Sequence, residues 1–276
     1  MLVTLKEILK TAEERKTAIG SFNTPNMTTV EAVVSAAEEL NQPVILMHAQ
    51  VHEEMGLCKM EDIAPVMLHF AKKTKVPVCV HLDHGTDIDY VKRGLSLGFT
   101  SVMYDGSVLS EEENTKNTKT VVAAAKETNA SVEAEIGFMG AREGGGESDS
   151  SVYTDPEAAV RFVMNTGIDA LACAFGTAHG FYKVKPKLDF ERLSEIAKRV
   201  SVPIVMHGGS GVSPQDYLEV IRRGVRKINY YTYMAKAGGA AVSGKEYNQF
   251  HDALTDAKAA MQADAAKAIS LFSNIE

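Results

Sequence analysis

Histidines follow short apolar segments at several places in this sequence, a position typical of catalytic groups. His84 lies in the run HLDHG, His179 in GTAHG, and His207 begins HGGSG. Three neutral imidazoles around one open coordination position suit a catalytic zinc ion. Taken singly, each histidine could equally cap a helix or fill a polar niche. A metal site is therefore indicated only if the elements that carry the three histidines bring them to one place.

Acidic side chains accompany these histidines. Asp105, Glu133 and Glu135 could orient the imidazole rings or ligate the metal themselves. Asp83 directly precedes His84, and neighbouring residues of a strand point to opposite faces. We therefore expect Asp83 to exchange a proton with bound substrate rather than to share the metal's face. A hydrogen bond from Asp83 to a histidine is the alternative.

Two segments late in the chain predict an anion site. HGGSG at 207–211 and NYYT at 229–232 offer backbone N–H groups and hydroxyls. Barrel enzymes often bind phosphate with the loops after their last two strands and a helix N-terminus. A GGSG alone is usually only a tight turn, so its place in the fold decides its meaning.

Eight short β-branched runs alternate with amphipathic segments. We predict strands at 17–22, 43–49, 77–82, 100–105, 131–136, 169–175, 203–207 and 226–231. We predict helices at 1–16, 26–40, 60–74, 87–97, 110–128, 155–166, 189–199, 213–223 and 249–272. Eight βα units in about 250 residues predict an α/β fold, a (β/α)₈ TIM barrel. We expect one domain over 1–276 with extra N-terminal and C-terminal helices. A doubly wound open sheet is the alternative, but no GxGxxG turn follows an early strand.

A barrel brings the candidate residues together, because the C-terminal ends of its strands meet at one face. His81 shares the strand parity of Asp83 and is expected one layer deeper, as an orienting or packing group. We assign no lysine to the barrel interior, which disfavours Schiff-base chemistry. The predicted strand ends carry Asn23, His48, Gln50, Asp83, His84, Asp105, Glu133, Glu135, His179, His207, Asn229 and Thr232.

Composition narrows the classes of function. The chain has 29 basic and 36 acidic side chains, a net charge of −7, which argues against nucleic-acid and anionic-membrane partners. Its apolar runs are shorter than the roughly 20 residues of a membrane helix. The first segment is amphipathic, unlike a signal peptide. The three cysteines form no CxxC pair, so we expect a reducing, cytoplasmic location.

Motifs along most of the chain resemble those of the class II ketose-bisphosphate aldolases, the fructose- and tagatose-bisphosphate aldolase family. The similarity is collinear from about residue 4 to 232 and is carried by HLDHG, DALACAFGTAHG and HGGSG in combination. GSFNTPN, TSVMYDGS and VEAEIG add shorter support. The resemblance implies a TIM barrel whose Zn²⁺ is bound by His84, His179 and His207, with Asp105 and Glu135 as alternative ligands.

The resemblance also implies the remaining roles. Asp83 is implied to move the proton at the aldehyde-derived hydroxyl, and Glu143, in the glycine-rich segment 140–151, the proton at the ketose carbon. A monovalent cation, Na⁺ or K⁺, is implied beside the dihydroxyacetone phosphate half, and the chain is implied to form a homodimer or homotetramer. The candidate substrate-binding residues are Asn23, Gly180, Gly208, Gly209, Ser210, Asn229 and Thr232.

Departures from the family pattern fall on the other half of the site. Met47 and Ala49 replace the usual Gln and Ser, Tyr231 and Tyr233 stand where small or acidic residues are usual, and the family's phosphate-binding Arg near the C-terminus has no clear match. We therefore expect an aldolase that cleaves a phosphorylated ketose reversibly to dihydroxyacetone phosphate and an aldehyde. A ketose 1-phosphate with a non-phosphate far end, such as a sulfonated or deoxy sugar, is the alternative substrate. A zinc hydrolase on the same barrel is the alternative from another class, and a non-catalytic subunit would have lost Asp83 or a ligand histidine.

Overall fold

The strands close into a parallel barrel. The structure, a computed structural model, describes residues 1–137, 153–177 and 186–275. Each barrel strand pairs in parallel with the strands before and after it, and the last pairs with the first, which confirms the predicted (β/α)₈ barrel. The eight barrel strands are β2 (Ile19–Asn23), β3 (Val44–Ala49), β4 (Val78–Gly85), β5 (Ser101–Tyr104), β6 (Ser131–Ile136), β7 (Ala170–Cys173), β8 (Ile204–Met206) and β9 (Val225–Tyr230).

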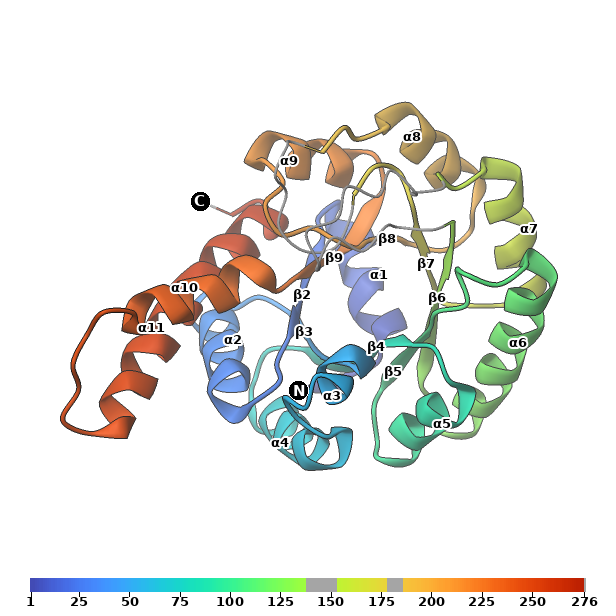
Figure 1. Cartoon of the computed structure of the whole chain (residues 1–276). Coiled ribbons are helices and arrows are strands. Elements are labelled where there is room, and N and C mark those ends of the chain that lie inside the picture. Colours follow the sequence, from blue (N-terminus) through green and yellow to red (C-terminus); the bar gives the residue numbers. More distant parts are fainter. Residues whose placement is uncertain (138–152, 178–185, 276) are drawn as a thin grey trace.

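Helices surround the strands as a ring (Figure 1). Their apolar faces pack on the outer sides of the strands and form the larger hydrophobic core. Polar side chains cap the first turns by accepting hydrogen bonds from backbone N–H groups, as Asn26, Asp87, Ser110 and Asp155 do. The ring consists of α2 (Met27–Glu39), α4 (Met60–Lys73), α5 (Ile88–Ser96), α6 (Glu111–Glu127), α7 (Pro156–Thr166), α8 (Phe190–Arg199) and α9 (Pro214–Arg222).

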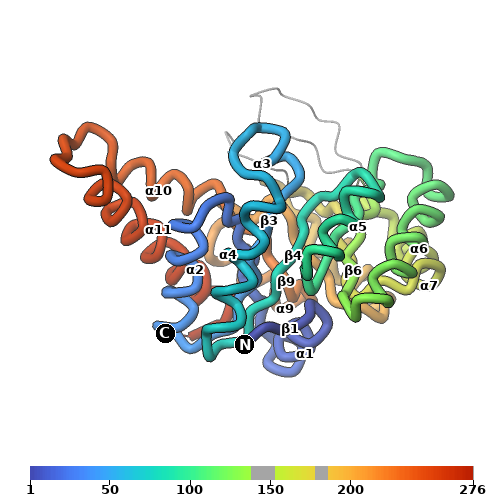
Figure 2. The backbone as a smooth tube through the Cα atoms, turned by 90° about the horizontal axis from the view of Figure 1, so that it is seen from below, coloured from blue at the N-terminus to red at the C-terminus, as the bar shows by residue number. Residues whose placement is uncertain are grey.

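Helix α1 (Leu5–Arg15) closes the N-terminal end of the barrel. Its buried side chains Leu5, Ile8 and Leu9 form a second core with residues that point into the barrel. Figure 2 shows α1 at one end of the strands and α3 (Gln50–Glu54) at the other. The predicted helix over 1–16 therefore starts too early, because β1 (Leu2–Val3) pairs with β4 and Thr4 caps α1.

Three elements of the structure were not predicted. These are β1, α3, which contains His52, and α10 (Thr232–Val242). Helix α10 and the following α11 (Phe250–Ser273) extend from the ring as an arm (Figures 1 and 2). Helix α11 then runs back against α2 and α9. Among the described residues, no helix is both long and apolar enough to span a membrane.

Phe272 anchors α11 to the barrel. Its side chain is fully buried, with its ring centroid 4.9 Å from that of Tyr217 and 6.2 Å from that of Tyr230. Its carbonyl oxygen accepts a hydrogen bond from Ala18 N at 3.0 Å. The end of the chain is thereby tied to the segment that leads into β2.

We expect Phe272→Ala to lower the free energy of unfolding by about 3–5 kcal/mol, the usual cost of removing a buried phenyl ring. Phe250→Ala is the matched control, because Phe250 starts the same helix and is 78% exposed. We expect that control to change stability by less than about 0.5 kcal/mol. Urea denaturation of both variants measures the difference, and equal losses would contradict the anchoring role of Phe272.

Candidate active site

An irregularity at the end of β4 shapes the candidate site. The register between β4 and β5 shifts between Leu82 and Gly85, and His84 has a φ of 47°. A left-handed backbone is uncommon for residues other than glycine and persists only where its surroundings hold it. Ligand atoms of Asp83, His84 and His207 lie within 4.8 Å of one another. The expected separation of Asp83 and His84 onto opposite faces is therefore wrong, because the bulge interrupts the alternation.

Two of the predicted ligand histidines face each other. His84 Nε2 lies 2.7 Å from His207 Nδ1. A carboxylate holds the other nitrogen of each ring: Asp105 Oδ2 lies 2.8 Å from His84 Nδ1, and Glu133 Oε1 lies 2.8 Å from His207 Nε2. Such contacts fix the orientation and tautomer of a ligand histidine. Two oriented imidazoles with carboxylates close by are a donor set that fits a divalent cation such as Zn²⁺.

Charge is unevenly shared between the two rings. Burial acts to lower the pKa of His84, but Asp83, Asp105 and Glu135 outweigh it and raise this pKa to about 10. For His207, burial and the neighbouring His84 together lower the pKa. The surplus of carboxylates around His84 favours positive charge at this point, which a proton or a metal cation can supply.

Two amides hold the carboxylate of Asp83. Asn23 Nδ2 donates to Asp83 Oδ2 at 3.2 Å, and Asn229 Nδ2 donates to Asp83 Oδ1 at 3.0 Å. Burial opposes ionisation of Asp83, but His84 and His207 outweigh it and keep the pKa below its usual range. Asn23 and Asn229, predicted as substrate-binding residues, thus lie beside the predicted catalytic acid.

Asp105 and Glu135 approach the histidines from different sides. Asp105 uses one oxygen for His84 and the other for Ser107, which donates from N at 3.1 Å and from Oγ at 2.7 Å. Glu135 is 2% exposed, and its Oε2 lies 3.9 Å from His207 Nδ1. In this arrangement Asp105 orients His84, and Glu135 is placed nearer to the facing ring nitrogens of the pair.

The loops after β8 and β9 lie against each other. Gly209 N donates to Asn229 O at 3.2 Å, and a Cβ at Gly209 would lie only 2.7 Å from that oxygen. Gly208 has a φ of 61°. Ser210 Oγ accepts a 3.0 Å hydrogen bond from the backbone N–H of Tyr231, which directly precedes Thr232. Because Thr232 opens α10, these predicted anion-binding residues meet at a helix N-terminus.

Three predicted site residues lie outside the residues that the structure describes. They are the third ligand histidine, the acid of the glycine-rich segment and one glycine of the substrate set: His179, Glu143 and Gly180.

A layer of charged side chains lies beneath the histidines, and only part of it was predicted from the sequence. Lys227 is fully buried, and its Nζ lies 2.9 Å from Glu133 Oε2, so the expectation of no lysine in the barrel interior is wrong. His81 lies in the same layer, as predicted, with Nδ1 2.8 Å from Ser101 Oγ and Nε2 3.6 Å from Glu133 Oε2. Strand alternation was the available signal, since it places Lys227 and Asn229 on the same side of β9.

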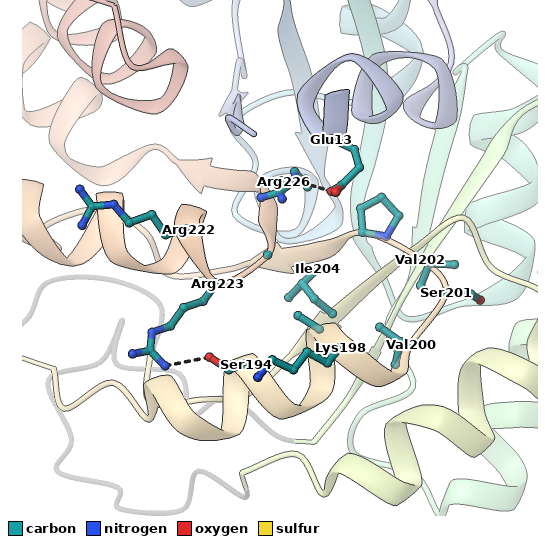
Figure 3. A pocket seen from close by; sticks show the side chains of 13 residues that line it. Glu13, Ser194, Lys198, Val200, Ser201, Val202, Ile204, Arg222, Arg223 and Arg226 are labelled. Carbon is teal, nitrogen blue, oxygen red and sulfur yellow. Dashed lines mark hydrogen bonds and ion pairs between the residues drawn. The ribbon is translucent and has the colours of Figure 1, made fainter. Parts of the chain in front are cut away.

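A cavity at the opposite end of the barrel contains none of the predicted site residues. Its volume is about 470 Å³, and it lies where β8 and β9 begin (Figure 3). Its charged lining includes Glu13, Lys198, Arg222 and Arg226. The predicted site residues that the structure describes lie instead toward the C-terminal strand ends, where barrel enzymes carry their active sites.

Known proteins resemble this chain over nearly its full length. The sequence model of the family described as "Fructose-bisphosphate aldolase class-II" matches residues 3–276. A fructose-bisphosphate aldolase of Staphylococcus aureus is 39% identical over 243 residues, 87% of this chain and 85% of the relative. A 6-phospho-5-dehydro-2-deoxy-D-gluconate aldolase of Halalkalibacterium halodurans is 41% identical over 242 residues, 87% of this chain and 84% of the relative.

A solved structure agrees with these matches. The YdjI aldolase from Escherichia coli K12 superposes with a TM-score of 0.89 at 34% identity, covering 99% of this chain and 97% of that one. The sequence match and the structural match thus indicate the same family, and both extend over almost the whole chain. The chain belongs to the class II fructose-bisphosphate aldolase family and is an aldolase, a lyase that acts on carbon–carbon bonds.

Proposed function

We propose that this aldolase depends on Zn²⁺ and cleaves a phosphorylated ketose reversibly to dihydroxyacetone phosphate and an aldehyde. The observation that carries the proposal is the facing pair of His84 Nε2 and His207 Nδ1, each ring held by a carboxylate. His179 is proposed as the third ligand, with Asp105 and Glu135 as alternative ligands. When bound, the cation would supply Lewis-acid stabilisation of the negative charge that develops on the ketone oxygens.

Proton movement is assigned to two acids. Asp83 is proposed to take the proton from the C4 hydroxyl as the C3–C4 bond breaks. Its place beside His84 and the two amides that fix its carboxylate support this role, because a base must be held in one orientation to act on one hydroxyl. Glu143 is proposed to move the proton at the ketose carbon, on the strength of the family resemblance.

The dihydroxyacetone phosphate half is proposed to lie over the loops after β8 and β9. Close packing of Gly209 on β9 and the start of α10 at Thr232 support a phosphate site with backbone N–H donors. A monovalent cation, Na⁺ or K⁺, is proposed nearby. The proposed binding residues are Asn23, Gly180, Gly208, Gly209, Ser210, Asn229 and Thr232.

The family relationship supports three further proposals. The chain is proposed to form one barrel domain, to assemble as a homodimer or homotetramer, and to act in the cytoplasm on a small sugar phosphate. The hydrolase alternative is not retained, because the chain belongs to a family of aldolases.

The far half of the substrate site favours a second candidate substrate. Met47 and Ala49 are buried, and the ring of Tyr231 lies 5.0 Å from the ring of His52. Met47 packs in the core inside the barrel, and Met47, Ala49 and Tyr231 offer no cationic donor for a second phosphate. A relative with 41% identity is named for a substrate that carries a single phosphate on a gluconate skeleton. A ketose 1-phosphate with a different far end is therefore the alternative substrate.

Removal of the metal ligands should remove the metal. We expect His84→Ala and His207→Ala each to lose bound zinc, and a chelator to abolish cleavage by the wild type, because both rings face one point. Elemental analysis measures the zinc, and thermal melts show whether each variant is folded. His69→Ala is the control, since His69 is exposed on α4. Full zinc occupancy in folded forms of both variants would contradict the assignment of His84 and His207 as metal ligands.

Loss of the proposed base should separate metal binding from turnover. We expect Asp83→Ala to keep its zinc and its fold while kcat falls by at least about 100-fold, the usual scale for one acid–base group. Asp89→Ala, an exposed acid on α5, should leave kcat unchanged. Steady-state cleavage assays coupled to dihydroxyacetone phosphate provide the comparison. A zinc-loaded Asp83→Ala enzyme with near-normal kcat would refute the proton-transfer role.

The departures from the family pattern in the far half of the substrate site should change the substrate specificity. We expect low kcat/KM for fructose 1,6-bisphosphate, and at least about tenfold higher kcat/KM for a ketose 1-phosphate with another group at the far end. The panel contains fructose and tagatose 1,6-bisphosphates and ketose 1-phosphates ending in a hydroxyl, carboxylate or sulfonate. A kcat/KM near or above about 10⁴ M⁻¹s⁻¹ for either bisphosphate would show that the ordinary family activity stands.

A further inference from the structure

A buried ion pair lies directly beneath the proposed metal site. Lys227 on β9 and Glu133 on β6 are both fully buried, and Lys227 Nζ lies 2.9 Å from Glu133 Oε2. These strands are separated by β7 and β8, so the two side chains meet across the barrel interior. The proposed mechanism gives neither residue a proton to move or a substrate atom to bind.

Glu133 connects Lys227 to His207. One carboxylate oxygen lies 2.9 Å from Lys227 Nζ, and the other lies 2.8 Å from His207 Nε2. We propose that Lys227 is a positioning residue, whose ion pair holds the Glu133 carboxylate in the orientation that fixes His207 for metal binding. This inference rests on the metal site of the proposed function and adds a residue to it.

The tautomer of His207 is the physical link. A neutral imidazole that donates from Nε2 to Glu133 keeps its lone pair on Nδ1, the nitrogen that faces His84. Supporting carboxylates of this kind typically change metal affinity by about 10–100-fold. The carboxylate therefore has to stay under His207, and Lys227 is the cation that holds its second oxygen.

His81 lies near the same Glu133 oxygen that pairs with Lys227. His81 Nε2 lies 3.6 Å from Glu133 Oε2, and its Nδ1 lies 2.8 Å from Ser101 Oγ. Without the Lys227 ammonium, the carboxylate loses its close countercharge in an interior where unpaired charge is costly. It can then turn toward His81 and leave His207 without a fixed tautomer.

The adjacent residue provides a matched control. Arg226 is 4% exposed and is ion-paired with Glu13 at the N-terminal end of the barrel (Figure 3). Arg226→Met and Lys227→Met thus each remove one buried cation from the same strand. Only Lys227→Met removes a cation that contacts the carboxylate beneath His207.

We expect Lys227→Met to weaken zinc binding by about 10–100-fold. Competition with a chelating dye measures the zinc Kd. In the metal-free protein, long-range ¹H–¹⁵N spectra of ¹⁵N-histidine-labelled chains should show the Nε2–H form of His207 in the wild type and a mixture in Lys227→Met. The His207 signal is assigned by its loss in His207→Gln. Arg226→Met should keep the zinc Kd within threefold and the tautomer unchanged, even where its melting temperature falls.

The double variant Glu133→Met/Lys227→Met covers the case in which Lys227→Met unfolds. Replacing both charges with apolar groups avoids an unpaired buried ion, so its melting temperature should exceed that of Lys227→Met. Its zinc Kd should remain weak, because His207 still lacks its carboxylate. Wild-type-like zinc Kd and tautomer in the double variant, or equal weakening in Arg226→Met, would overturn the role of Lys227. A wild type that binds no zinc would instead overturn the proposed function, and the metal-free tautomer comparison would still decide the role of Lys227.

Discussion

Charge buried inside the barrel must be paired, and this constraint links the strands that carry the candidate site. Asp105 holds His84, His84 faces His207, His207 contacts Glu133, and Glu133 pairs with Lys227. The chain of contacts runs across the barrel from the end of β5 to the interior of β9. Each group contacts the next, so the protein's own side chains hold both rings in fixed orientations. This preorganisation is what an aldolase needs, because the charge of the departing enolate must be met by groups that do not have to rearrange.

The bulge at the end of β4 belongs to the same arrangement. A regular strand would send Asp83 and His84 to opposite faces, whereas the left-handed backbone at His84 lets both approach His207. The amides of Asn23 and Asn229, from two adjacent strands, then hold Asp83 on both oxygens. Local strain at His84 is thus offset by contacts from several strands, the usual setting for an unusual backbone conformation at a functional residue.

The sequence predicted the barrel, and it placed the candidate residues at the C-terminal strand ends, because its signals are local and repeated. Apolar runs and caps identify each βα unit, and parallel topology then brings the strand ends together. Helix α10 was missed because Gly238 and Gly239 lower its helix propensity, while packing makes the helix: a Cβ at Gly238 would lie 2.8 Å from Met261 Cγ. Lys227 was missed because lysine is rarely buried, although strand alternation points it inward. The grouping of Asp83 with His84 depends on the bulge, which has no marker in a single sequence.

The central claim is that His84 and His207 bind one cation between them. A crystal structure of the zinc-soaked enzyme, with anomalous data collected on both sides of the zinc edge, tests it most directly. The account predicts one strong anomalous peak about 2.0–2.1 Å from both His84 Nε2 and His207 Nδ1, the usual zinc–imidazole distance. A zinc peak elsewhere in the molecule, with these two nitrogens still facing each other and unligated, would contradict it.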